Sequence, residues 1–80
     1  MAVLRLFAQA REAAGTPSLE LAGASVGEVL DLASLQLGPA FDEVLASSKL
    51  WLNGEPTDRG VAVSDADEVA VLPPISGGNA

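Results

Sequence analysis

The feature that most constrains the fold is that a chain of 80 residues contains no cysteine and no histidine. Neither disulfides nor a Cys/His zinc site can hold such a chain together, so a single hydrophobic core has to do so. Hydrophobic residues make up 49% of the sequence, which is enough for one small domain. A domain of this size has little room for an internal substrate cavity, so we expect function on the surface or in a tail.

The same composition excludes several kinds of site and partner. Without cysteine and histidine there are no thiolate nucleophiles, iron–sulfur ligands or histidine-based triads. Eleven acidic residues against four basic ones give a formal charge of −7, which repels nucleic-acid phosphates and anionic membranes. Residues 1–7 have neither a basic leader nor a long apolar run, so we expect no signal peptide, no membrane segment and a cytoplasmic location.

Alternating hydrophobic residues predict strands near the start of the chain. Residues 2–8 have the period of a half-buried strand, with Leu4 and Leu6 on one face and Val3, Arg5 and Phe7 on the other. Residues 18–21 alternate again and are expected to pair back on the first strand. The small, polar stretch 9–16, which contains Gly15, is expected to connect the two strands without a helix.

A capping box at Ser25 and Glu28 predicts the start of the main helix. Apolar residues follow at the spacing of one helical face, namely Val26, Val29, Leu30, Ala33 and Leu37. The sequence Gly38-Pro39 is expected to end this helix. Leu35 falls opposite the apolar face, so either the last turn deviates or this leucine is exposed.

The second half of the chain predicts a short second helix and three more strands. The helix begins at Pro39, carries Phe41, Val44 and Leu45, and ends near residues 47–48. Residues 50–52 lead through Asn53-Gly54, a strong hairpin signal, into a short return strand. A turn at 64–67 precedes a last strand at 68–72, and Pro73-Pro74 ends the sheet. This order predicts an α+β fold with about five strands and the main helix across one face.

Motifs at both ends of the chain carry a resemblance to a known family. Phe-Ala-Gln-Ala-Arg-Glu stands at residues 7–12, Leu-Asn-Gly-Glu at 52–55, Asp-Glu-Val at 67–69, and Pro-Pro-Ile-Ser-Gly-Gly at 73–78. Together they make the chain resemble the small subunit of molybdopterin synthase over nearly its whole length. The resemblance implies a β-grasp, ubiquitin-like fold whose mixed sheet places the fifth strand beside the first and third. It divides the chain into a domain at 1–75 and a flexible tail at 76–80.

The resemblance also implies a function as a sulfur carrier. In this family, an activating enzyme uses ATP to adenylate the terminal glycine carboxylate, which here is Gly78, and the adenylate becomes a thiocarboxylate. The tail then enters the large subunit of the synthase, in a complex of two small and two large subunits, and gives its sulfur to a pterin precursor of the molybdenum cofactor. The chain itself is expected to bind no cofactor or metal and to have no activity alone.

Two features of the tail bear on this expectation. Gly77 and Gly78 have no side chains, so they can pass through a narrow channel, and the terminal carboxylate reacts once a partner converts its oxygen into a good leaving group. The chain continues with Asn79-Ala80, however, where a carrier should end at Gly78. A protease trims these residues, or they are an artefact, or the chain is not a competent carrier; we favour the first two.

A docking face is predicted from strand alternation together with the implied strand order. Phe7, Trp51 and Leu72 point away from the main helix and come from three neighbouring strands. Aromatic residues grouped on an uncovered sheet face more often mark a protein contact than chance exposure. We therefore predict that the synthase large subunit and the activating enzyme bind there. The predicted contact continues along the start of the tail, through Pro73, Pro74, Ile75 and Ser76.

Other charged residues have simpler explanations. Arg11 and Glu12 match the family motif, yet a surface ion pair would explain them equally well. Asp65, Asp67 and Glu68 lack the spacing of a calcium loop and suit turn chemistry better. Lys49 is the only lysine and by default a solvated surface charge.

Three alternative functions remain open at this stage. A carrier of the same fold could serve thiamine or cysteine synthesis and would share the tail. A binding module or protein modifier would use the sheet face, with an incidental tail. An enzyme acting alone is the least expected class, because the sequence shows no titratable pair, metal constellation or phosphate loop.

Overall fold

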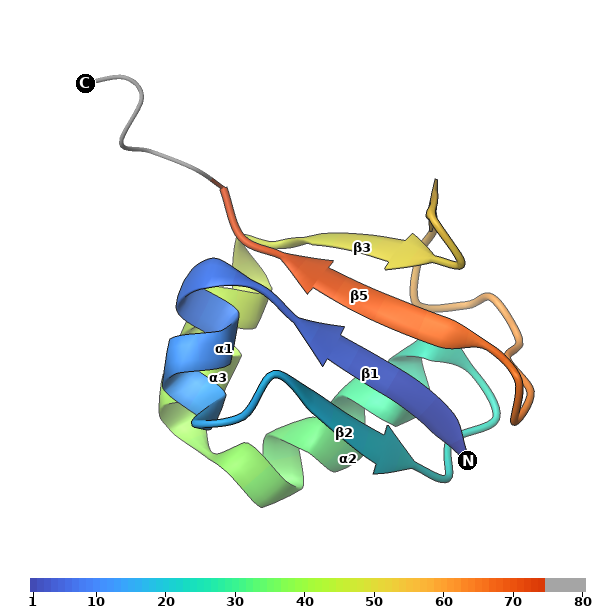
Figure 1. Cartoon of the computed structure of the whole chain (residues 1–80), viewed down its shortest axis with the longest axis horizontal. Helices are drawn as coiled ribbons and strands as arrows, with labels where there is room; N and C mark the ends of the chain where they lie inside the picture. Colours follow the sequence, from blue (N-terminus) through green and yellow to red (C-terminus); the bar gives the residue numbers. More distant parts are fainter. Residues whose placement is uncertain (75–80) are drawn as a thin grey trace.

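The computed structural model describes residues 1–74, which form one mixed sheet with helices packed against one side (Figure 1). The helices are α1 (Ala8–Ala14), α2 (Val26–Leu37) and α3 (Pro39–Ala46). The strands are β1 (Ala2–Leu6), β2 (Ser18–Leu21), β3 (Lys49–Leu52), β4 (Glu55–Pro56) and β5 (Glu68–Leu72). No helix in this part of the chain is both long and apolar enough to cross a membrane.

The last strand lies in the middle of the sheet. The order is β2-β1-β5-β3-β4, so the two ends of the domain meet as neighbouring strands (Figure 1). β5 runs parallel to β1 and antiparallel to β3, while β1 and β2 are antiparallel. This order confirms the α+β, β-grasp prediction, including the placement of the fifth strand beside the first and third.

The connection between β1 and β2 is the main difference from the sequence prediction. Residues 9–16 were expected to contain no helix, but α1 occupies most of this stretch and ends at Gly15, whose N–H donates to the Arg11 carbonyl at 2.9 Å. β1 therefore stops at Leu6, two residues early, and Phe7 becomes the N-cap of α1. Only Ala10 of α1 is buried, so the helix has no wide apolar stripe from which periodicity could have found it.

The predicted capping box at the start of α2 is confirmed with one shift. The Glu28 backbone N–H donates to Ser25 Oγ at 3.2 Å. Glu28 Oε1 in turn accepts from the backbone N–H of Ala24 at 2.8 Å, whereas a standard capping box uses the backbone N–H of the N-cap residue, here Ser25. Two amides at the helix start are thus satisfied by side chains, which fixes where α2 begins.

The open question at Leu35 is settled by its exposure, which is 84%. The last turn of α2 stays helical, and this leucine simply points into solvent. α3 then begins with Pro39 at the first helical position and ends before Ser47, as predicted.

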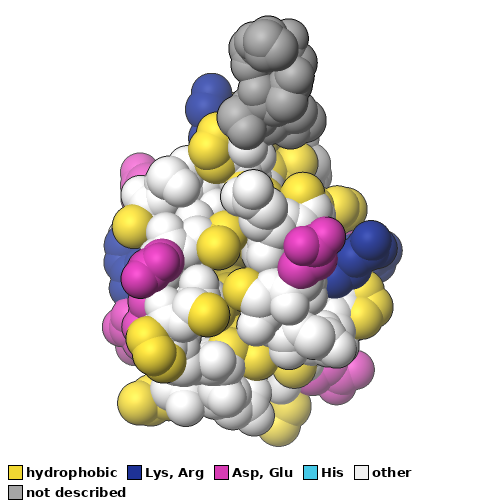
Figure 2. Space-filling model, turned by 90° about the vertical axis from the view of Figure 1, so that its left-hand side faces the viewer, with side chains coloured by type: hydrophobic (Ala, Val, Ile, Leu, Met, Phe, Trp, Pro, Cys, Tyr) yellow, Lys and Arg dark blue, Asp and Glu magenta, His cyan; other side chains and the backbone are white. Residues whose placement is uncertain are grey.

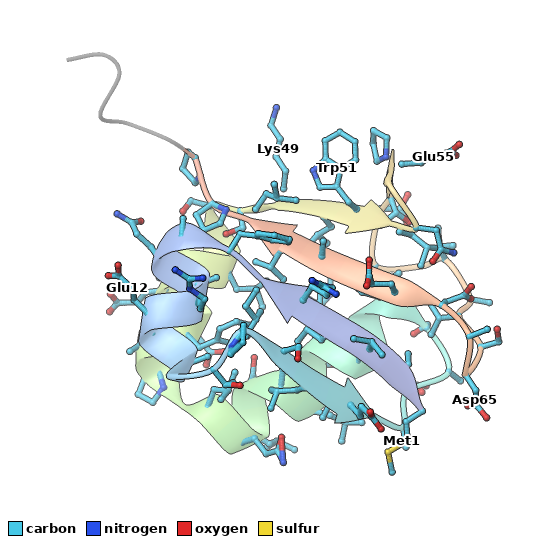
Figure 3. The ribbon with its side chains drawn as sticks, viewed as in Figure 1. Met1, Glu12, Lys49, Trp51, Glu55 and Asp65 are labelled. Carbon is cyan, nitrogen blue, oxygen red and sulfur yellow. The ribbon has the colours of Figure 1, made fainter. Side chains whose placement is uncertain are left out.

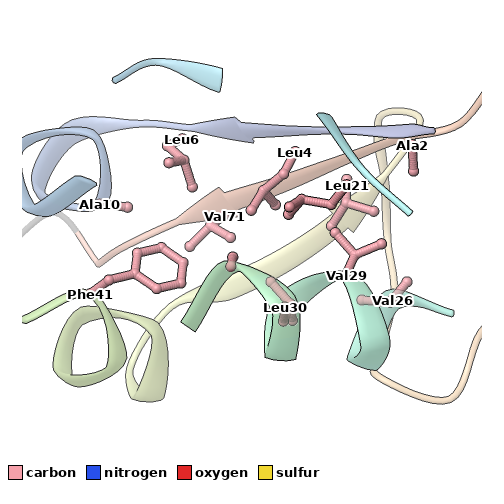
Figure 4. Packing of buried hydrophobic residues seen from close by; sticks show 12 residues of the cluster. Ala2, Leu4, Leu6, Ala10, Leu21, Val26, Val29, Leu30, Phe41 and Val71 are labelled. Atoms are coloured by element: carbon pink, nitrogen blue, oxygen red, sulfur yellow. The ribbon is translucent and has the colours of Figure 1, made fainter. Parts of the chain in front are cut away.

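One hydrophobic core lies between the sheet and the helices (Figure 4). The strands contribute alternate residues and α2 contributes the predicted stripe, apart from Leu37, which is only partly buried. Phe41 of α3 is 0% exposed and heads the fully buried side chains ranked by volume. The core residues are Ala2, Leu4, Leu6, Ala10, Leu21, Val26, Val29, Leu30, Ala33, Phe41, Val69 and Val71.

The hairpin turn after β3 is tied to the start of β5 by Asn53. Its φ of 51° and the φ of 87° at Gly54 are left-handed, as the predicted Asn-Gly turn requires. Asn53 Nδ2 donates to Asp67 Oδ1 at 2.9 Å, and Asn53 Oδ1 accepts from the Glu68 backbone N–H at 2.9 Å. The asparagine side chain thus joins the turn to the central strand, a role that its turn propensity alone did not predict.

These bonds make the acid stability of the fold depend on Asp67. The Asn53 amide first, and then the Ser64 backbone N–H, hold the pKa of the Asp67 carboxyl below its ordinary value. A carboxylate whose pKa is lower in the folded state stabilises the fold above its unfolded pKa, and this contribution is lost as pH falls through the folded pKa. We therefore expect the stability advantage of the native chain over Asp67→Asn to shrink as the pH falls below about 5 and through the lowered pKa of Asp67 in the folded state.

Thermal melting of both proteins across this range measures that difference. Asp65→Asn is the matched control, because Asp65 pairs with the terminal amine of Met1 at 3.1 Å and is almost fully exposed. A difference between the native chain and Asp67→Asn that stays constant with pH would contradict the expectation.

Candidate functional site

One face of the sheet is left uncovered by the helices, and we call it the open face. Strand alternation places Arg5 of β1, Ala70 and Leu72 of β5, and Trp51 of β3 on it, because their neighbours Leu4, Val71 and Leu50 pack toward the core. In Figure 3, Lys49 and Trp51 project from β3 toward the same side. The open face is therefore formed by the three central strands.

An apolar hollow of about 350 Å³ lies on the open face. We call it the aromatic hollow, and its lining residues are Phe7, Trp51, Gly54, Glu68, Ala70 and Leu72. Phe7 is 42% and Leu72 36% exposed, and Trp51 is partly buried. The structure thus brings together the three residues that the sequence predicted for docking, and their binding role stays a prediction.

A second hollow of about 400 Å³ adjoins the first, at the point where the chain leaves the sheet. We call it the tail-root hollow, and it is lined by Ser47, Lys49, Trp51, Leu72, Pro73 and Pro74. Trp51 and Leu72 line both hollows, so the two form one continuous surface. The predicted contact residues Pro73 and Pro74 are part of it. The remaining predicted site residues, Ile75, Ser76, Gly77 and Gly78, lie outside the described residues.

The sequence prediction missed three lining residues of the aromatic hollow, namely Gly54, Glu68 and Ala70, and two of the tail-root hollow, namely Ser47 and Lys49. Ala70 faces the same side as Leu72 by alternation, so the period of β5 could have identified it. Glu68 lies on that face as well, since it stands two residues before Ala70. Gly54 belongs to the turn after β3 and lines the hollow through the pairing of β3 with β5. The position of Gly54 depends on strand order, which no local pattern reports.

The charges on the open face are partly neutralised. Arg5 Nη1 lies 3.3 Å from Glu68 Oε2, and both side chains are about half exposed. Lys49 is exposed and forms no ion pair with any residue among 1–74. Arg11 and Glu12 are both exposed and, within the same residues, form no ion pair either, so the ion pair that could have explained them is not formed.

The carboxylates of the described residues do not assemble into a metal site. Within residues 1–74 no three side chains of the metal-binding types converge. The acidic residues near the last turn have turn partners, since Asp67 accepts from Asn53 and Ser64 and Asp65 pairs with the chain's amine. At the end formed by α1 and α3, Figure 2 shows hydrophobic side chains spread among charged side chains and white atoms, with no single large apolar patch. The open face is therefore the better candidate for a protein contact.

The sequence model of the ThiS family matches residues 4–78, which is most of the chain. This chain belongs to the ThiS family. Among curated ThiS-like relatives, the molybdopterin synthase sulfur carrier subunit of Arabidopsis thaliana is 42% identical over 76 residues, covering 91% of this chain and 78% of the plant protein. The protein of the same name from Chlamydomonas reinhardtii is 39% identical over 77 residues, covering 90% of this chain and 92% of the algal protein.

Solved structures show the same fold for this ThiS family member. SAMP1 of Haloferax volcanii, a small archaeal modifier protein, superimposes with a TM-score of 0.85 at 31% identity, over 96% of this chain and 98% of that one. A chain from the complex of subunits 1 and 2 of the Helicobacter pylori molybdopterin-converting factor superimposes with a TM-score of 0.71 at 20% identity. That match covers 92% of this chain and 93% of the other, and it bears on the fold alone.

Proposed function

We propose that this chain is the sulfur carrier subunit of a molybdopterin synthase, with the sulfur held as a thiocarboxylate on Gly78. Two curated relatives with this name, 42% and 39% identical over most of the chain, support the proposal. The observation that carries it is the position of the tail root, at the end of the central strand and beside an apolar hollow. One contact can thereby hold the body and direct the tail into the same partner.

The chemistry of loading takes place on the backbone of the chain. A Gly78 carboxylate oxygen attacks the α-phosphorus of ATP bound by the activating enzyme, and pyrophosphate leaves. The outer sulfur of a donor persulfide then attacks the carbonyl carbon, and AMP leaves with the former carboxylate oxygen. A thiol attacks the donor's sulfur in the resulting acyl disulfide, so that the thiocarboxylate leaves and a disulfide forms between the thiol and the donor. ATP is bound by the partner, and the carrier itself needs no cofactor and turns nothing over alone.

The described residues determine where the tail begins, and the length of the tail limits how far the reactive carbon can lie from the sheet. Pro73 and Pro74 offer no backbone N–H, so the sheet ladder cannot continue past Leu72. Gly78 stands four residues after Pro74, and an extended chain spans at most about 3.3–3.6 Å per residue, so the reactive carbon can lie up to about 14 Å beyond Pro74. A partner that covers the open face can thus enclose a reaction centre well away from the hollow.

The partners proposed are the large synthase subunit, in a heterotetramer, and an adenylating enzyme, all in the cytoplasm. The curated relatives from A. thaliana and C. reinhardtii are named as subunits of molybdopterin synthase, which supports a contact with a further synthase subunit. The aromatic hollow gives this chain an uncovered apolar surface for that contact.

Mass spectrometry of two versions of the chain tests the proposal. One version ends at Gly78 and the other at Ala80, and each is incubated with ATP, a sulfur donor and the cognate activating enzyme. We expect the version ending at Gly78 to gain the mass difference between sulfur and oxygen, and the longer version to gain nothing. Omitting ATP is the control. A Gly78 version that never acquires sulfur with an active enzyme would exclude the carrier function.

A protein modifier is the second candidate, because SAMP1 is similar at a TM-score of 0.85. The same incubation distinguishes it when other proteins are present. A modifier appears joined through its terminal glycine to lysines of those proteins, whereas a carrier transfers sulfur to a pterin precursor once the large subunit is added.

A further inference from the structure

We propose that Lys49 is a partner-recognition residue, which pairs with an acidic side chain of the large synthase subunit beside the entrance for the tail. The inference rests on the proposed function, because it requires a partner that encloses the tail. It adds an electrostatic contact to the apolar contact proposed for the aromatic hollow.

The position of Lys49 is fixed by the sheet. It is the first residue of β3 and lies opposite Leu72, the last residue of β5, in the antiparallel register. It therefore stands beside the chain immediately before the tail begins. Figure 3 shows its side chain on the same side of β3 as Trp51, nearer to the end from which the chain leaves.

The charge of Lys49 is unusual for its surroundings. The chain has a formal charge of −7 and only four basic residues. Of these, Arg5 pairs with Glu68 on the open face, and Arg59 pairs with Asp31 on the helix side. Arg11 is unpaired within residues 1–74, but it lies on α1 and lines neither hollow. Among residues 1–74, Lys49 is the only cation that lines either hollow, and it has no acidic partner there.

A protein carboxylate fits this position better than a phosphate of the adenylate. Lys49 lies at the base of the tail, whereas Gly78 reaches about 14 Å beyond Pro74 when the tail is extended in a partner. The ammonium group is then too far from the acyl phosphate to neutralise it. The partner surface that covers Trp51 and Leu72, by contrast, must also cover Lys49, since all three line the tail-root hollow. A carboxylate there keeps the lysine charge paired as water is excluded.

Carbodiimide cross-linking of the assembled complex tests the contact directly. The reagent activates a carboxyl group, the Lys49 amine attacks it, and an amide forms as the urea leaves. Because Lys49 is the only lysine, its cross-links are separated from those of the terminal amine by peptide mass spectrometry. We expect an amide between Lys49 and an Asp or Glu of the large subunit. Cross-links that involve only the terminal amine would overturn the proposal.

Affinity measurements provide the second test. We expect Lys49→Glu to weaken binding of the large subunit at least about tenfold, and Lys49→Met, which keeps the apolar stem, to weaken it several-fold and reduce its salt dependence. Gln36→Glu is the matched control, because it makes the same change in net charge as Lys49→Met at an exposed position of α2.

The outcomes separate this inference from the function it rests on. Equal affinity for the native chain and both Lys49 variants, or the same loss for Gln36→Glu, would overturn the recognition role while leaving the carrier function intact. A native chain that does not bind the large subunit at all would instead overturn the proposed function, and this inference with it. Melting curves establish that each variant is folded.

Discussion

Replacing Trp51 with alanine is expected to weaken binding of the large subunit by about 2–4 kcal/mol, or roughly 30- to 700-fold. Trp51 lines both hollows and lies in the strand next to the central one, so it occupies the middle of the proposed contact. Tryptophan in a desolvated, central position commonly dominates interface energetics. Titration calorimetry against the purified large subunit measures the change.

The fold should survive this substitution. Trp51 is only partly buried and is absent from the core cluster, whereas its neighbours Leu50 and Leu52 pack against that cluster. The matched control is Leu35→Ala, which removes a large apolar side chain that is 84% exposed on α2. Binding that is equally affected by both substitutions, or by neither, would show that the aromatic hollow is not the docking site.

Replacing Phe41 with alanine is expected to destabilise the fold by about 3–5 kcal/mol. Phe41 is 0% exposed and belongs to the core between α3 and the sheet (Figure 4). Small domains are stable by only about 5–15 kcal/mol, so this loss takes a large part of the total. Denaturant unfolding followed by circular dichroism measures it, and a midpoint close to that of the native chain would contradict the expectation.

Leu35→Ala again supplies the comparison. This substitution also truncates a large hydrophobic side chain on a helix, but the Leu35 side chain lies in solvent. Its effect on the free energy of unfolding should therefore stay within about 0.5 kcal/mol. A large loss of stability for Phe41→Ala and a small one for Leu35→Ala would show that α3 contributes to the core through Phe41 and that the outer surface of α2 does not contribute.

The parts of the fold predicted from sequence are those with local signals. Ser25 and Glu28 determine the start of α2 because both side chains bond to nearby amides. Alternation identified β1 and β5 because only one of their faces is buried. α1 gave no such signal, because it contacts the core only through small side chains: Ala10 is buried, and Ala13 and Ala14 are partly buried against the core.

Local sequence patterns predicted only part of the candidate site. Alternation shows that Trp51 and Leu72 face away from the core, but it does not show that they are neighbours. Their proximity follows from the central position of β5, which came from the family resemblance and is confirmed by the sheet order. The contact from Asn53 to Asp67 and the lack of a partner for Lys49 among residues 1–74 are likewise tertiary facts, which no spacing in the sequence encodes.

The central position of β5 determines how the sheet responds to force when a partner protein binds the C-terminal tail. Tension applied to the tail passes through Pro74 into β5, whose hydrogen bonds to β1 on one side and β3 on the other bear the load together. The pull acts along the strand, so these bonds are sheared as a group and are not opened one after another. We therefore expect the sheet to stay folded when a partner pulls on the tail.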